Sequence, residues 1–156
     1  MKKCDKARLA LYGSLTLLVL TFIYSQSMLS RQDSAEVSGF VAIYLKAIID
    51  PMGRIDPETY HHLVRKAAHF TEFLFLGVSF GRFYAVLGAI TGKRNVSAPL
   101  LVVLFVAVSD EYLQYFTQRG SAVTDVVLDF SGALCGLLLV SLWGYLLRKR
   151  RIAYEA

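Results

Sequence analysis

The stretch from Ser109 to Gly132 reads SDEYLQYFTQRGSAVTDVVLDFSG, and it decides how the rest of the chain is organised. It runs off the end of one apolar segment and into the start of the next. Ionisable and amide side chains recur along it, namely Asp110, Glu111, Gln114, Arg119, Asp125 and Asp129. Charged groups within membrane-compatible sequence are energetically costly, so their presence indicates a functional site.

The composition predicts an integral membrane protein. Of the 156 residues, 55% are hydrophobic, and the mean hydropathy is +0.47. A soluble domain of this size could not cover its surface with so few polar groups. The formal net charge is +5, and the basic residues gather at the two chain ends, which suits orientation in a membrane better than binding to nucleic acid. Cys4 and Cys135 lie far apart in the sequence, which argues against a disulfide.

Four apolar segments are each long enough to cross the roughly 30 Å hydrocarbon core of a bilayer. The first could also be read as a cleaved signal peptide, since it has a basic start and an apolar run. The run is long for that class and YSQS at 24–27 is a poor cleavage site, so we interpret it as a span. We therefore predict an all-α fold, an integral membrane bundle of four transmembrane helices in a single domain over residues 1–156, with spans at about residues 9–29, 67–90, 98–116 and 125–147.

Local signals predict where one helix starts and how two helices pack. Asp56 is a helix cap, Pro57 suits the first helical position, and Glu58 suits the helix dipole. Glycines at four-residue spacing allow close helix contact, and this pattern occurs in the second span at Gly77, Gly81, Gly88 and Gly92 and in the fourth at Gly132 and Gly136. The glycine face of the fourth span also carries Asp125 and Asp129, so close packing would draw both carboxylates into the bundle.

The distribution of basic residues predicts the orientation. Positive charge in short flanking segments favours the cytoplasm. Four spans place the N-terminus, the Lys93-Arg94 connection and the basic run at 148–151 on one side, so we predict that both termini are cytoplasmic.

This orientation places polar ends of all four spans near the outer surface. Arg65, His69 and Glu72 fall at i, i+4 and i+7, on one face of the second span. Five carboxylates so close together cannot all ionise cheaply, so they are paired with bases such as Lys66, protonated, or bound to a metal. The candidate polar cluster is His69, Glu72, Asp110, Glu111, Gln114, Asp125 and Asp129, and the candidate anion-binding residues are Arg65 and Arg119.

Two interpretations need no metal. In the first, the cluster is a buried salt-bridge network that fixes helix packing. In the second, His69 beside Glu72 acts as an acid or base with help from Asp110 or Glu111, while the two arginines hold a phosphate or carboxylate.

A third interpretation is a divalent metal site. No tight ligand spacing such as H-E-x-x-H is present, and no Walker or Rossmann fingerprint occurs, so no nucleotide cofactor is expected. His61 and His62 sit just outside the span and are interpreted as a solvated helix turn. An oxygen-rich metal shell would draw on His69, Glu72, Asp110 and Asp125.

Three segments together resemble the signature of the VanZ-like family: RKAAHFTEF at 65–73, SDEYLQYFTQR at 109–119 and TDVVLDFSGALCG at 124–136. The order and spacing fit the family pattern over most of the chain from about residue 60 onward. Two positions depart from it. Thr117 and Gln118 precede Arg119 where the family often has Pro-Gly, and Asp129 stands where the family usually has Asn.

The resemblance implies a small bacterial protein that crosses the cell membrane several times and has the lipid bilayer as its partner. The founding member confers low-level resistance to teicoplanin, a lipoglycopeptide antibiotic that acts on the outer face of the membrane. We therefore expect an outward-facing polar pocket that binds or modifies an envelope lipid, an envelope precursor or a lipoglycopeptide. The alternative is a non-enzymatic membrane interaction protein whose charged cluster is structural. The sequence leaves open whether a reaction is catalysed.

Overall fold

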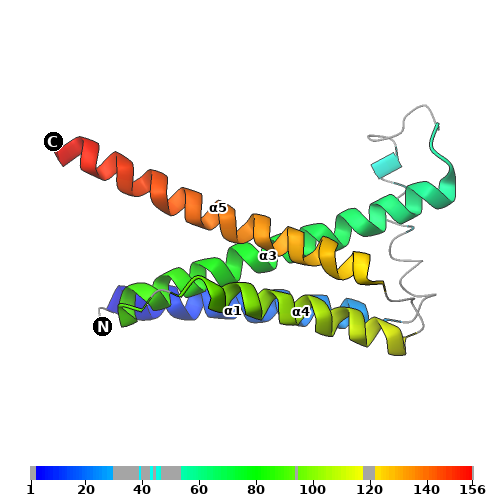
Figure 1. Ribbon diagram of the computed structural model, residues 1–156, viewed down its shortest axis with the longest axis horizontal. Helices are drawn as coiled ribbons and strands as arrows, with labels where there is room; N and C mark the ends of the chain where they lie inside the picture. The colour runs from blue at the N-terminus through cyan, green and yellow to red at the C-terminus, as the bar shows by residue number, and fades with distance from the viewer. Residues whose placement is uncertain are drawn as a thin grey trace.

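The computed structural model describes residues 3–29, 39, 43, 45, 46, 54–93, 95–117 and 122–155. Four long α-helices account for most of them: α1 (Lys3–Ser27), α3 (Pro57–Thr91), α4 (Ser97–Phe116) and α5 (Val123–Glu155) (Figure 1). Each is long and apolar enough to cross a membrane. The predicted all-α fold with four membrane-spanning helices is confirmed.

The helices extend beyond the predicted spans. α3 has 35 residues and starts ten residues before the predicted span, and α5 has 33 residues and continues past residue 147 to Glu155. At 1.5 Å per residue each is about 50 Å long, well beyond the roughly 30 Å hydrocarbon core. Charged residues at these ends stop the apolar pattern but not the helix, since they are good helix formers. α1 ends at Ser27, two residues short of the predicted limit.

The start of α3 follows the predicted capping signal. The Asp56 carboxylate accepts a hydrogen bond from the Thr59 backbone N–H at 3.2 Å, and Pro57 occupies the first helical position. The other end stops at Gly92, whose φ of +71° is the left-handed conformation that favours glycine. Gly92 therefore ends the helix rather than contributing to the helix-packing face that its spacing suggested.

α3 and α5 cross in close contact, while α1 and α4 run alongside each other (Figure 1). A Cβ atom added at Gly132 would overlap the backbone carbonyl of Phe70, and one at Gly136 would overlap that of Leu74. A Cβ at Gly77 would overlap the carbonyl of Ala133 on the opposite helix. The predicted glycine face of the fourth span is thus in backbone contact with α3.

The bundle has a thin apolar core and an apolar exterior. Ile23, Phe73 and Val103, from three different helices, are each at most 1% exposed. On the outside, Leu17 and Phe105 are 66% and 72% exposed. Exposed side chains of this kind are costly in water and stable against lipid, which agrees with a membrane bundle.

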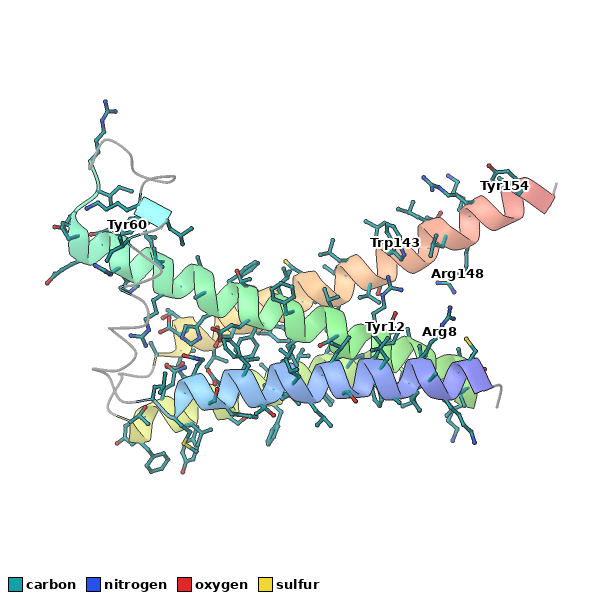
Figure 2. The ribbon with its side chains drawn as sticks, turned by 180° about the vertical axis from the view of Figure 1, so that it is seen from behind. Arg8, Tyr12, Tyr60, Trp143, Arg148 and Tyr154 are labelled. Carbon is teal, nitrogen blue, oxygen red and sulfur yellow. The ribbon has the colours of Figure 1, made fainter. Side chains whose placement is uncertain are left out.

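The two ends of the bundle differ in character. Both chain termini lie at one end (Figure 1), and Figure 2 shows Arg8 and Arg148 there and Tyr60 at the opposite end. Four spans in alternating directions require this arrangement. We call the end that holds the start of α3 and the end of α4 the pocket end, and the other the terminal end.

The orientation in the membrane stays a prediction from the positive charge of the terminal end. Reporter fusions placed after Arg150 and within residues 118–122 should give signals from opposite sides, with the first in the cytoplasm. Signals from the same side would contradict a four-span topology, and a cytoplasmic signal from the second fusion alone would reverse the orientation.

Candidate functional site

Polar side chains are buried where α1, α3, α4 and α5 come together at the pocket end. These residues are almost inaccessible, with exposed fractions of 0% for Asp110, 1% for Asp129 and Ser27, 2% for Gln114 and 5% for Glu111. Burying polar groups is costly unless they are hydrogen-bonded or bound to a ligand. Each of them therefore requires an identified partner.

Asp110 is held by two donors. The Ser27 hydroxyl at the end of α1 donates to Asp110 Oδ1, and the Gln114 side-chain amide donates to Oδ2 at 2.8 Å. Thr117 Oγ1 donates to the Ser27 backbone carbonyl at 3.2 Å. Nearby, the Tyr24 and Ser109 hydroxyls lie 2.8 Å apart. These contacts fasten α1 to α4, so this part of the cluster has a structural role.

Beside this network lies a pocket of about 170 Å³. We call it the headgroup pocket after the ligand that is proposed for it below. Within it, Arg65 Nη2 donates to Gln114 Oε1 at 3.5 Å, and Lys66 Nζ lies 3.3 Å from Asp125 Oδ1. The Lys66 and Asp125 side chains are 37% and 30% exposed, so this ion pair lies at the rim. The pocket is lined by His62, Arg65, Lys66, His69, Glu111, Gln114, Asp125 and Leu128.

Glu111 connects the pocket to the start of α5. Its Oε1 atom accepts a hydrogen bond from the Ala122 backbone N–H at 2.6 Å, just before the first residue of α5. Its Oε2 atom is buried and accepts no hydrogen bond from any residue that the structure describes. One oxygen of Glu111 therefore positions the helix start, and the other is left for a ligand, a proton or water.

A second group lies deeper in the bundle. His69 on α3, Asp110 on α4 and Asp129 on α5 each place one candidate ligand atom within 4.8 Å of the others. His69 Nδ1 is 3.9 Å from Asp129 Oδ1. Neither Asp129 oxygen accepts a hydrogen bond within the described part of the chain. We call these three residues the buried triad.

One predicted candidate lies outside the headgroup pocket, and another is not among the described residues. Glu72 is half-buried in a groove between α1 and α3, beside Leu18 and Phe22, and does not line the headgroup pocket. The crossing of α3 over the bundle explains this (Figure 1), because one straight face of α3 meets different neighbours along its length. Glu72 still lies close enough to Asp129 for the two carboxyl groups to interact electrostatically. Arg119 lies outside the described residues.

The structure therefore brings together His69, Asp110, Glu111, Gln114, Asp125, Asp129 and Arg65. It also includes Ser27, which was predicted only as part of the polar end of the first span, and His62, to which the sequence interpretation gave no site role. Ser27 ends α1 at the same depth as the acids, and its polarity at the end of an apolar span was the available signal. His62 lines the headgroup pocket and is exposed to solvent. The predicted solvated position of His62 therefore agrees with a place at the rim of this pocket.

Four membrane-spanning helices with ionisable side chains buried among their ends define a multi-pass membrane protein with a polar site inside the bundle. The family model described as VanZ/LLP1 matches residues 11–144. This match covers most of the chain, so the protein belongs to the VanZ/LLP1 family, and the resemblance inferred from the three motifs is confirmed. The protein is accordingly a multi-pass protein of the cell membrane. No curated protein and no solved structure matches the chain.

Proposed function

We propose that the headgroup pocket binds the negatively charged headgroup, most simply a phosphate, of an envelope lipid or lipid-linked envelope precursor. The observation that carries this proposal is the environment of Arg65. Its guanidinium is half-buried and donates to the neutral amide of Gln114, and it forms no ion pair with a described carboxylate. Glu111 lines the same pocket and attracts this charge, but no described carboxylate reaches ion-pair distance of the guanidinium, which therefore keeps donors for an anionic ligand.

The position of the pocket supports a lipid ligand. It lies among helix ends, next to helix faces whose apolar side chains are exposed, so we expect it at the level of the lipid headgroups. Acyl chains can therefore stay in the bilayer while the headgroup enters. Guanidinium and ammonium groups bind phosphate oxygens through short, charge-assisted hydrogen bonds.

The size of the pocket decides among the ligands expected from the family. Pockets for drug-sized ligands are about 300–1,000 Å³, whereas this one is about 170 Å³. It accommodates a phosphate or small headgroup but not an entire lipoglycopeptide. Teicoplanin-type resistance, if this member confers it, would follow from binding a lipid or precursor rather than from enclosing the antibiotic.

The purely structural alternative accounts for only part of the cluster. It fits Asp110, whose two oxygens both accept hydrogen bonds from the protein. It does not explain why the buried Glu111 Oε2 atom lacks a donor, or why no described carboxylate reaches ion-pair distance of Arg65. A network retained solely for packing would satisfy its buried members, because unsatisfied ones lower stability.

The proposal is tested with purified full-length protein in phosphatidylcholine nanodiscs titrated with fluorescent phosphatidylglycerol. Arg65→Gln should weaken binding by about 10- to 100-fold, the loss expected for a charge-assisted hydrogen bond. Arg82→Gln is the matched control, because Arg82 lies on the same helix but lines a different pocket, with Arg8.

The result contradicts the proposal if Arg65→Gln binds phosphatidylglycerol like the native protein, or if Arg82→Gln loses as much affinity. A parallel titration with inorganic phosphate separates the two sources of the anion. Displacement of the fluorescent lipid by inorganic phosphate at similar concentration would identify a free-anion site instead of a lipid site.

A further inference from the structure

We propose that the buried triad of His69, Asp110 and Asp129 binds one divalent transition-metal ion, of the Zn²⁺ or Mn²⁺ type. This site adjoins the headgroup pocket and shares His69 with it, whereas neither Asp110 nor Asp129 lines that pocket. It shares His69 and Asp110 with the metal shell predicted from the sequence, and has Asp129 in place of Glu72 and Asp125. The inference does not depend on headgroup binding.

The geometry of the triad suits a small ion. Three helices each supply one ligand, an imidazole nitrogen and two carboxylate oxygens, with all three atoms within 4.8 Å of one another. Metal–ligand bonds of about 2.1 Å in a tetrahedral site place neighbouring ligands roughly 3.4 Å apart. His69 Nδ1 and Asp129 Oδ1 are 3.9 Å apart, so small side-chain rotations would close the site.

A second observation points to a ligand. Asp129 is 1% exposed, and neither of its carboxylate oxygens accepts a hydrogen bond from any described residue. Glycine contacts at Gly132 hold this stretch of α5 firmly against α3, so Asp129 cannot easily turn towards water. A buried carboxylate without hydrogen bonds is costly, and a cation at the triad would remove that cost.

Asp110 is already oriented for such a role. Ser27 donates to one oxygen of Asp110 and Gln114 donates to the other, which fixes the direction of the carboxylate. Hydrogen bonds of this kind around a metal ligand fix its direction and raise affinity. The network that fastens α1 to α4 therefore also positions a ligand.

The ligand types select the class of metal. Mg²⁺ and Ca²⁺ prefer all-oxygen shells, whereas imidazole favours transition metals. Three protein ligands also leave at least one coordination position open, as in catalytic rather than structural zinc sites. His69 lines the headgroup pocket as well, so an ion could enter through that pocket.

The test uses the full-length protein in detergent, stripped with EDTA, dialysed and loaded with ZnCl₂. Metal analysis should find about one Zn²⁺ per chain in the native protein. Asp129→Asn and His69→Gln should each weaken binding by at least about 100-fold, beyond the usual effect of losing a supporting hydrogen bond. Asp125→Asn is the matched control. Asp125 is half-exposed and lies one turn before Asp129 on the same helix, so this variant should retain the metal.

Co²⁺ loading provides a readout that a packing defect does not imitate. Native protein should develop visible ligand-field absorption that His69→Gln lacks, while circular dichroism confirms that the variant is folded. Failure of the native protein to retain Zn²⁺ or Mn²⁺, or equal retention by both triad variants, would overturn the proposal. Headgroup binding is measured separately in EDTA, so the two proposals can fail independently.

Discussion

Replacing Gly132 with valine is expected to prevent α3 and α5 from closing on each other. Even one Cβ at this position would overlap the Phe70 carbonyl oxygen, which belongs to the backbone and cannot rotate away. Overpacking usually costs about 1–3 kcal/mol when side chains can adjust. Here the two helices must separate, so we expect a loss of at least about 3 kcal/mol of unfolding free energy.

Gly144→Val on the same helix is the control for this prediction. Its nearest neighbour to an added Cβ is the flexible Arg148 side chain at 4.0 Å. Unfolding in mixed micelles, followed by circular dichroism, should show a large loss for Gly132→Val and almost none for Gly144→Val. Equal stability of the two variants would mean that the close crossing of α3 and α5 does not hold the bundle together.

Two buried aspartates should respond in opposite ways to alanine substitution when metal is removed with EDTA. Asp110→Ala leaves the buried Gln114 amide without its acceptor and should cost about 1–3 kcal/mol. Asp129→Ala removes a carboxylate that accepts no hydrogen bond from the described residues. Removing the buried carboxylate also removes its desolvation cost, which offsets the packing lost with the side chain. The free energy of unfolding should therefore stay the same or rise.

Unfolding of both variants in the same micelles measures this contrast. The structural interpretation of the whole cluster requires both substitutions to be destabilising by similar amounts, so equal losses would favour that interpretation. A loss confined to Asp110→Ala would show that Asp129 is retained at a cost to stability, as residues in functional sites often are.

Much of the fold follows from local patterns in the sequence. Apolar length is enough to predict four spans, and Asp56-Pro57 is enough to predict the start of α3. The glycine spacing of α5 predicted that both Asp125 and Asp129 would be buried, because a face without side chains must pack against another helix. Asp129 is buried, whereas Asp125, one turn nearer the helix start, is 30% exposed at the rim.

The remaining details depend on tertiary geometry. Periodicity placed Glu72 beside His69, yet the crossing of α3 turns Glu72 towards α1. Periodicity shows which residues share a face of a helix, but not which other helix that face contacts. The hydrogen bond from Ser27 on α1 to Asp110 on α4 was therefore not predicted. The triad combines residues from three helices, and no spacing within one segment indicates it.

The central claim is that an anionic lipid headgroup binds to Arg65 and Lys66 at the pocket end. Photo-crosslinking with phosphatidylglycerol that carries a diazirine on its headgroup tests this most directly, with the modified residues located by mass spectrometry. We predict modification within residues 62–69 of α3 and 111–114 of α4, and its loss in Arg65→Gln. Modification confined to the terminal end, around Arg8 and Arg82, would contradict the account.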